Sequence, residues 1–306
     1  MKARVLGAAA GGGFPQWNSN APACNRARRG DAAARARTQA SLAVSADGEH
    51  WFLLNASPDL RQQIEAAPQL HPKQGLRSSP IAGVVLTGGD VDAIAGLLSL
   101  RERQAFTVYA TAKVHEVLKA NPVFNVLAPG VVARQVLALG QANSLLLPNG
   151  AASGLTVELF AVPGKVPLYL EDAEGVPPIV LGEDTVGAVI SDAHAKLFYI
   201  PGCAAMTADM AQRLRDAELV LFDGTLWRDD EMIRAGLGSK TGRRMGHMSL
   251  SGVDGTIAAF AGLNVRKKIL VHINNSNPVL LDDSSERAEA EAAGWQVAHD
   301  GMELWP

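Results

Sequence analysis

The alternation of hydrophobic and polar positions predicts antiparallel strands near the start of the chain. Residues 38–47 alternate small apolar and polar side chains, as a half-buried strand does. Asp47 and Gly48 then form a typical hairpin pair, and residues 51–55 supply the returning apolar strand. Earlier, the glycine run at 11–13 follows a short apolar strand. It is compatible with either a phosphate-binding loop or a tight backbone turn.

The middle and end of the chain are instead typical of strands followed by helices. Residues 84–86 form an apolar run, the polar segment 87–92 interrupts it, and helical periodicity follows. A second strand and helix cover 106–121, and further apolar runs lie at 155–162, 217–225 and from residue 267. Hairpins combined with strand–helix units predict an α/β fold in which helices flank two mixed β-sheets.

Chemically active side chains gather where the predicted strands end. They are Asp90, Asp92, Lys165, Cys203, Asp223, His247 and His272. Loops at the ends of strands on a rigid scaffold are where binding and catalytic residues concentrate. The pattern therefore predicts a site at one edge of the sheets.

Asp90 and Asp92 allow two interpretations. On an extended segment, side chains two residues apart point to one side, and two carboxylates brought together favour a cation between them. Alternatively, these residues cap the helix that we expect to begin near Ala93, because aspartate is favoured at helix starts. The two residues alone do not decide between metal binding and capping.

Composition and charge narrow the class of protein. The 306 residues are 47% hydrophobic and 19% charged, and the formal net charge is −3. This length and composition allow a substantial core, and we expect a single domain over 1–306. The small net charge gives no reason to expect a nucleic-acid partner. With no apolar run long enough for a membrane span and only two cysteines, we expect a soluble cytoplasmic protein without disulfides.

The central segment resembles the signature of the metallo-β-lactamase superfamily, T-H-x-H-x-D-H-x-x-G. Residues 87–96 fit this frame, with an apolar strand before it and a helical segment after it. Three expected histidines are replaced, by Gly88, Asp90 and Ala93, and only Asp92 keeps its expected type. The resemblance implies an αββα sandwich with a degenerate metal motif.

Later parts of the superfamily frame are better preserved. A histidine expected after a Pro-Gly turn is replaced by Lys165, and an expected bridging aspartate falls on Cys203. Asp223, His247 and His272 fit the end of the frame that is similar to ribonuclease Z, where the last histidine is a metal ligand.

Within the superfamily, long motifs resemble the family of the B protein of pyrroloquinoline quinone (PQQ) biosynthesis. They lie at 11–18, 55–64, 162–172, 221–227, 245–252 and 272–280. Family members usually bind a structural zinc through a cysteine triplet. Here Ser19, Ala21 and Cys24 stand at those positions, so we expect no structural zinc.

The resemblance assigns roles to the candidate site residues. It implies metal ligands at Asp90, Asp92, His272 and Asp223, and catalytic roles for Asp92, His247 and Lys165. It also places Arg243, Arg244 and Asn275 in substrate binding. Each candidate has a structural alternative: a turn pair for Asp223, a loop anchor for His247, a buried core histidine for His272 and surface charge for the two arginines. Lys165 could pair with a substrate carboxylate or replace a metal ion as an internal cation.

Three functions remain open. The resemblance implies an Fe(II)- and O₂-dependent hydroxylase acting on the tyrosine ring of a cross-linked Glu–Tyr precursor of PQQ, although such a site also accepts Mn²⁺ or Zn²⁺. A non-enzymatic carrier that moves PQQ or its precursor toward the periplasm is the second function, and a divergent metal-dependent hydrolase is the third. The missing histidines disfavour the hydrolase. The oligomeric state is not readable from the sequence, although members of this family often form homodimers.

Overall fold

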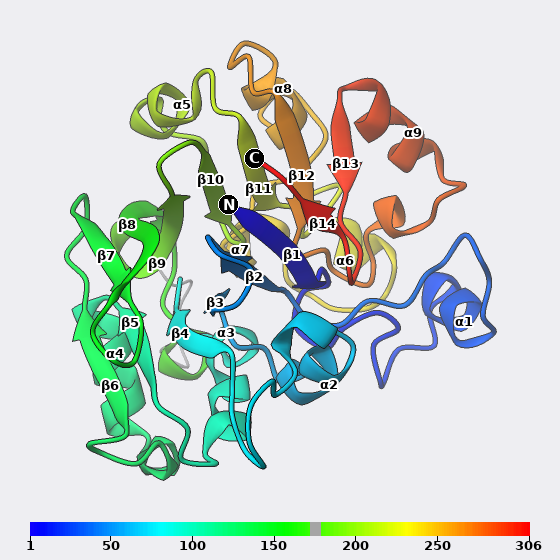
Figure 1. Cartoon of the computed structure of the whole chain (residues 1–306). Coiled ribbons are helices and arrows are strands. Elements are labelled where there is room, and N and C mark those ends of the chain that lie inside the picture. Colours follow the sequence, from blue (N-terminus) through cyan, green and yellow to red (C-terminus); the bar gives the residue numbers. More distant parts are fainter. Residues whose placement is uncertain (172–178) are drawn as a thin grey trace.

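The computed structural model describes residues 1–171 and 179–306 and contains two seven-stranded β-sheets (Figure 1). Asp172, the last residue of the motif at 162–172, lies outside the described residues. The first sheet has the order β14-β1-β2-β3-β4-β5-β6. Its strands are β1 (Lys2–Gly7), β2 (Ser41–Ser45), β3 (Trp51–Leu54), β4 (Ile81–Val85), β5 (Phe106–Ala110), β6 (Val132–Val136) and β14 (Glu303–Leu304).

The second sheet has the order β13-β12-β11-β10-β9-β8-β7. Its strands are β7 (Ala142–Leu146), β8 (Ala152–Gly164), β9 (Val180–Ser191), β10 (Lys196–Ile200), β11 (Leu219–Asp223), β12 (Lys267–Val271) and β13 (Trp295–Val297). Both sheets combine an antiparallel half with a parallel half. The parallel halves are β3 to β6 in the first sheet and β10 to β13 in the second.

Short helices connect the strands. The α-helices are α1 (Pro22–Arg28), α2 (Leu60–Glu65), α3 (Val91–Ile94), α4 (Ala112–Ala120), α5 (Ala208–Leu214), α6 (Glu231–Arg234), α7 (Gly242–Met245), α8 (Thr256–Phe260) and α9 (Ser285–Ala292). The 3₁₀ helices are η1 (Pro68–Leu70), η2 (Ala95–Leu100), η3 (Pro122–Val126), η4 (Leu168–Leu170) and η5 (Pro278–Leu280). Thr111, Thr207, Thr241 and Ser284 begin α4, α5, α7 and α9 with side-chain caps, which satisfy N–H groups that a helix start leaves free.

Three hydrophobic clusters hold these layers together. One lies between the sheets and contains side chains such as Leu42 and Val85 of the first sheet and Leu221 of the second. Another packs α2, α3, η2, α4 and η3 on the outer face of the first sheet. The third packs α1, α5, α8 and α9 on the outer face of the second. Helices thus flank two face-to-face mixed sheets, and the predicted αββα sandwich is confirmed.

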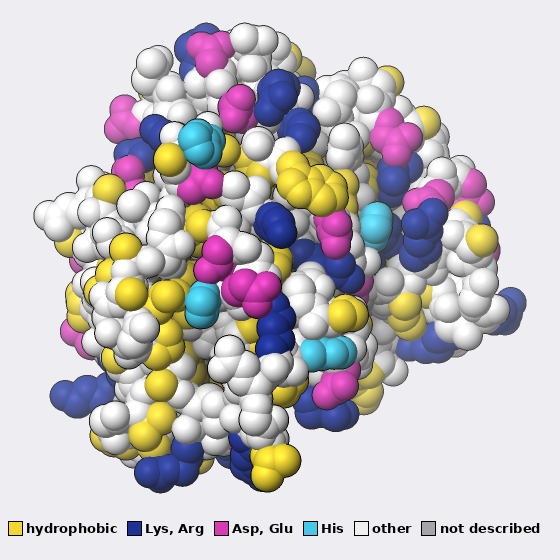
Figure 2. All heavy atoms as spheres, in the orientation of Figure 1, with side chains coloured by type: hydrophobic (Ala, Val, Ile, Leu, Met, Phe, Trp, Pro, Cys, Tyr) yellow, Lys and Arg dark blue, Asp and Glu magenta, His cyan; other side chains and the backbone are white. Residues whose placement is uncertain are grey.

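The surface agrees with the small net charge. Figure 2 shows basic and acidic side chains interspersed over one face, without a broad patch of a single sign. No helix within 1–171 or 179–306 is long and apolar enough to cross a bilayer.

Candidate functional site

A cavity of about 380 Å³ opens at the edge where parallel strands of both sheets end. Asp90 and Asp92 follow β4, and Lys165 follows β8. His272 follows β12, and His247 lies just after α7. The fold therefore brings to one cavity five of the seven residues that the sequence placed at strand ends, whereas Cys203 and Asp223 are buried and do not line it.

The two aspartates do not cap the helix with their side chains. Asp90 occupies the N-cap position of α3, but its side chain makes no capping hydrogen bond. Asp92 lies inside α3, which begins at Val91, two residues before the helix start expected near Ala93, so the two aspartates do not lie on one extended segment. Its Oδ2 instead accepts a hydrogen bond from His272 Nε2 at 2.8 Å. The side chains of Asp90 and Asp92 contribute to the cavity wall.

The pKa values of the two aspartates are shifted in opposite directions. Burial, and after it the negative charge of Asp92, raise the pKa of Asp90. Burial alone would also raise the pKa of Asp92, but the hydrogen bond and charge of His272 lower it. Two carboxylates with little access to water are stabilised together either by a nearby positive charge or by protonation of one of them.

His272 is the polar partner of Asp92 in this structure. It has a left-handed backbone (φ 55°) directly after β12, which turns the chain out of the strand. Its Nδ1 lies 2.9 Å from Thr225 Oγ1 and its Nε2 faces Asp92. Burial by itself would lower the pKa of His272, but Asp92, with Asp223 and Asp90 behind it, raises it. An imidazolium that donates to both partners fits these contacts.

The ring of His247 stacks on the ring of His272 and is hydrogen-bonded to Asp223. The two rings stack with centroids 5.2 Å apart and an interplanar angle of 21°. His247 Nδ1 donates to Asp223 Oδ2 at 2.7 Å. The other ring nitrogen, Nε2, makes no hydrogen bond within the described part of the chain. The pairing with Asp223 thus fixes the orientation of a ring whose second nitrogen remains for a ligand.

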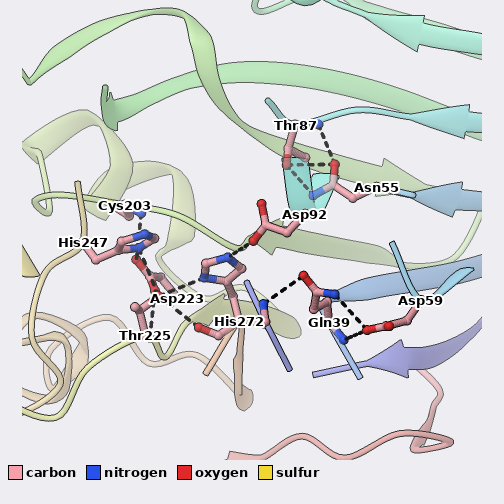
Figure 3. Close-up of polar contacts among 11 residues, drawn as sticks. Gln39, Asn55, Asp59, Thr87, Asp92, Cys203, Asp223, Thr225, His247 and His272 are labelled. Atoms are coloured by element: carbon pink, nitrogen blue, oxygen red, sulfur yellow. Dashed lines mark hydrogen bonds and ion pairs between the residues drawn. The ribbon is translucent and has the colours of Figure 1, made fainter. Parts of the chain in front are cut away.

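Asp223 and Thr225 form the centre of this network (Figure 3). Asp223 is fully buried, and its Oδ1 accepts from Thr225 N at 2.9 Å and Thr225 Oγ1 at 2.6 Å. Its Oδ2 accepts from Cys203 N at 2.9 Å as well as from His247. Burial would raise the pKa of Asp223, but the charge and hydrogen bond of His247 lower it. The carboxylate is therefore ionised and fully hydrogen-bonded.

These contacts bear on which atoms could hold a metal. Asp223, His247 and His272 have ligand atoms within 4.8 Å of one another. However, Thr225 Oγ1 lies within 3.1 Å of all three side chains. Since both oxygens of Asp223 already accept two hydrogen bonds each, we place Asp223 behind the histidines. The donors available toward the cavity are then the imidazole Nε2 atoms together with Asp90 and Asp92.

Lys165 is bound to a neighbouring carboxylate. Its Nζ lies 2.6 Å from Glu171 Oε1, and Arg244 Nη2 lies 3.0 Å from Glu171 Oε2. Arg244 thus reaches the wall of the cavity through Glu171, whereas Arg243 is exposed and does not line it. The structure separates the two arginines that the sequence grouped together.

Asn275 lies behind the cavity rather than in its lining. Its amide is buried and contacts Asn274 and Gln16, and Cys24 Sγ donates to its Oδ1 at 3.6 Å. The neighbouring Asn274 lines the cavity instead. At the other positions of the expected cysteine triplet, Ser19 Oγ accepts a hydrogen bond from Ala21 N at 3.3 Å.

Several supporting residues were not predicted. Buried Asn55 makes two hydrogen bonds with Thr87, which lies three residues before Asp90. Thr87 N donates to Asn55 Oδ1 and Asn55 Nδ2 donates to Thr87 Oγ1, both at 2.9 Å. Thr225 and Lys240 also line the cavity. Asn55 and Thr225 belong to quoted motifs, but amides and hydroxyls are too common in loops to be selected from sequence alone.

The glycine run at 11–13 forms a tight backbone turn beside the aspartates. Gly12 and Gly13 have φ of 91° and 73°, which favour glycine. Gly12 N donates to Gln39 Oε1 at 3.0 Å, and Gln39 is in turn held by Asp59 (Figure 3). This contact anchors the turn next to Asp92.

Comparison with known proteins identifies the family. The family described as "Beta-lactamase superfamily domain" matches residues 50–273. The chain is 62% identical over 300 residues to "Coenzyme PQQ synthesis protein B" of Gluconacetobacter diazotrophicus, covering 98% of both chains. It is 55% identical over 304 residues to the protein of the same name from Xanthomonas oryzae, covering 99% of both. The chain belongs to the coenzyme PQQ synthesis protein B family.

A solved structure from the same family agrees. The "Zn(2+)-bound PqqB from Methylobacterium extorquens" has a TM-score of 0.96 and 53% identity, with full coverage of both chains. The family resemblance inferred from the motifs is confirmed. That relative binds Zn²⁺ as its description states, so a divalent metal is compatible with this fold.

Proposed function

We propose that this chain acts in PQQ synthesis as an Fe(II)- and O₂-dependent hydroxylase. Its substrate would be the tyrosine ring of the cross-linked Glu–Tyr precursor. The observation that carries the proposal is the convergence of two histidines and two aspartates on one cavity. The relatives' name, "Coenzyme PQQ synthesis protein B", supports the pathway but does not specify the reaction.

The donor set fits a divalent metal. His272 Nε2 and Asp92 Oδ2 are 2.8 Å apart, with Asp90 and His247 lining the same cavity. A cation there would stabilise the charge of Asp92, which the hydrogen bond from His272 now stabilises. Imidazole and carboxylate ligands with open positions are typical of non-haem Fe(II) sites. When bound, Fe(II) would supply the electrons that activate O₂.

The protein's own residues would orient this site. Asp223 holds His247 through Nδ1, and Thr225 holds His272 through Nδ1. Partners of this kind fix the ring orientation and leave Nε2 as the ligand atom. These contacts support His272, Asp92, Asp90 and His247 as the proposed metal ligands, with Asp223 and Thr225 as positioning residues.

The proposed reaction balances without an external reductant. A phenol and one O₂ give an ortho-quinone and one water. One oxygen atom forms the new C–O bond and the other leaves as water. The two electrons that reduce the second oxygen come from the ring as it reaches the quinone level. The ring also loses a proton, which a basic side chain lining the cavity can accept.

The test begins with iron content under anaerobic conditions. We expect about one Fe(II) per chain in the wild type and little in Asp92→Ala and His272→Ala, because each removes a proposed ligand. Oxygen consumption is then measured with a tyrosine-containing dipeptide. Consumption that needs both iron and the dipeptide supports the hydroxylase.

The other two functions give different results in the same experiment. A carrier would bind PQQ equally well in the wild type and both variants, without iron and without oxygen uptake. A hydrolase would cleave the dipeptide without consuming oxygen. Either result would refute the proposed reaction.

A further inference from the structure

The cavity carries basic as well as acidic side chains. Lys165 and Lys240 both line it. Lys165 is already paired with Glu171, whose side chain is only 6% exposed. Burial would raise the pKa of Glu171, but hydrogen bonds from Lys165 and Arg244 lower it, so its carboxylate is ionised. Lys165 therefore already has a carboxylate partner within the protein, which it shares with Arg244.

Lys240 lies in a different environment. It is half-buried on the loop between α6 and α7, next to Thr241, which caps α7. It makes no hydrogen bond or ion pair with any residue in 1–171 or 179–306. A lysine can bury its aliphatic stem while its ammonium group remains free to contact a partner. Lys240 thus offers an uncompensated positive charge to the cavity.

We propose that Lys240 binds a carboxylate of the substrate and thereby sets its orientation. This inference rests on the proposed function, since a Glu–Tyr precursor carries carboxylates beside the tyrosine ring. Lys240 would attract a carboxylate, while Asp90 and Asp92, which line the same cavity, are engaged as proposed metal ligands. The uncharged ring is then the part of the substrate that faces the aspartates and histidines. The site would select acidic substrates over their neutral analogues.

A ligand-and-mutant comparison tests this assignment by binding alone. The protein is loaded with Zn²⁺, which is redox-inert, so that no oxygen chemistry intervenes. Dissociation constants are measured for Glu–Tyr and for the neutral analogue Gln–Tyr amide. We expect Lys240→Gln to weaken Glu–Tyr binding about tenfold, typical of one charge-assisted hydrogen bond. Binding of the amide should not change.

Two further variants separate charge from structure. Lys240→Arg keeps the charge and should bind Glu–Tyr within about threefold of the wild type. Lys119→Gln is the matched control, because Lys119 is an exposed lysine of α4 outside the cavity. It should leave both dissociation constants unchanged.

The inference is overturned if Lys240→Gln binds Glu–Tyr like the wild type, or loses affinity equally for both ligands. A wild type that does not prefer Glu–Tyr over its amide also overturns it. Charge-dependent binding together with an iron-loaded protein that inserts no oxygen would refute the hydroxylase and leave the role of Lys240 intact. The two proposals therefore fail in distinguishable ways.

Discussion

At the scale of single residues, the site depends on side chains that are not themselves proposed metal ligands. Asp223 is fully buried yet contacts His247 and Thr225, and Thr225 contacts His272. Removing such a group leaves buried donors or acceptors unpaired, which costs about 1–3 kcal/mol each. Small polar residues behind the ligands should therefore affect metal binding.

Thr225→Val tests this directly. Valine keeps the shape but removes the hydroxyl, so Asp223 loses a donor and His272 Nδ1 loses its partner. We expect about 10–100-fold weaker metal binding and a loss of roughly 1–3 kcal/mol in the free energy of unfolding. Isothermal titration with Zn²⁺ and urea denaturation measure the two effects. Thr225→Ser retains the hydroxyl and is the control. Wild-type metal affinity in Thr225→Val would contradict the role given to Thr225.

The free energy of unfolding should depend on pH through Glu231. Glu231 is buried, with Ser276 Oγ donating to it at 2.5 Å and Trp227 N at 2.7 Å. Burial raises its pKa to about 7 despite these hydrogen bonds. Between its ordinary pKa and 7, the folded chain keeps a proton that the unfolded chain has lost. This contribution to stability is complete at low pH and is lost as pH rises toward 7.

Glu231→Gln should remove that dependence. From about pH 4.5 to pH 8, the free energy of unfolding of the variant should rise relative to the wild type by up to about 3 kcal/mol. Urea denaturation across this range measures the difference. Parallel pH profiles for the two proteins would show that Glu231 does not titrate in this way.

Sequence reasoning succeeded and failed at this scale for identifiable reasons. Asp92 and His272 could be selected because both stand at metal-facing positions of a known frame, and the structure brings them into contact. Asn275 was selected over Asn274, although only Asn274 lines the cavity. One residue of offset in a loop reverses a side chain's direction, and the sequence does not specify loop geometry to that precision.

At the scale of elements, close packing around the central turn positions the aspartates. Gly96 of η2 donates its N–H to Ala56 O at 2.8 Å. A Cβ at Gly96 would come within 2.1 Å of Ser57 O, which is a backbone atom. The final glycine of the signature frame therefore permits η2, and α3 before it, to pack directly on the loop after β3.

Gly96→Ala should be strongly destabilising. The added methyl group must displace backbone, and overpacking of this kind costs about 1–3 kcal/mol or more. Gly262→Ala is a suitable control, because its Cβ would meet nothing within 4 Å and its backbone is not in the left-handed region. Thermal denaturation should show a clear drop for Gly96→Ala and little change for Gly262→Ala. Equal stability of the two variants would contradict the close approach.

The strands themselves were largely predictable from the sequence, but the order in which they pair within each sheet was not. Strong apolar runs such as 106–110 and 267–271 became strands β5 and β12. The helix expected to begin near Ala93 begins at Val91, between Asp90 and Asp92. Helix boundaries are set by local contacts that periodicity does not specify to the residue. The order of strands within each sheet depends on contacts distant in sequence.

At the scale of the whole molecule, the site joins the two sheets. Asp90 and Asp92 follow a strand of the first sheet, whereas Asp223 and His272 belong to or follow strands of the second. A metal held by Asp92 and His272 would therefore link both halves of the sandwich. Ligands that bind only the folded state stabilise it by mass action.

Metal addition should accordingly raise the thermal stability of the wild type. At a Zn²⁺ concentration about 100-fold above the dissociation constant, linkage predicts about 2.7 kcal/mol of added stability. Asp92→Ala and His272→Ala should both lose most of this added stability, although Asp92 follows a strand of the first sheet and His272 a strand of the second. Differential scanning calorimetry with and without Zn²⁺ measures it. A full gain in either variant would place the metal elsewhere.

The most direct test of the proposed hydroxylase is isotope labelling of its product. The iron-loaded protein is supplied with ¹⁸O₂ and a tyrosine-containing dipeptide, and the product is reduced and analysed by mass spectrometry. We expect one ¹⁸O atom on the ring per turnover, with none incorporated from labelled water during a short reaction. A ring without ¹⁸O, or with oxygen from water alone, would contradict O₂-dependent hydroxylation by this chain.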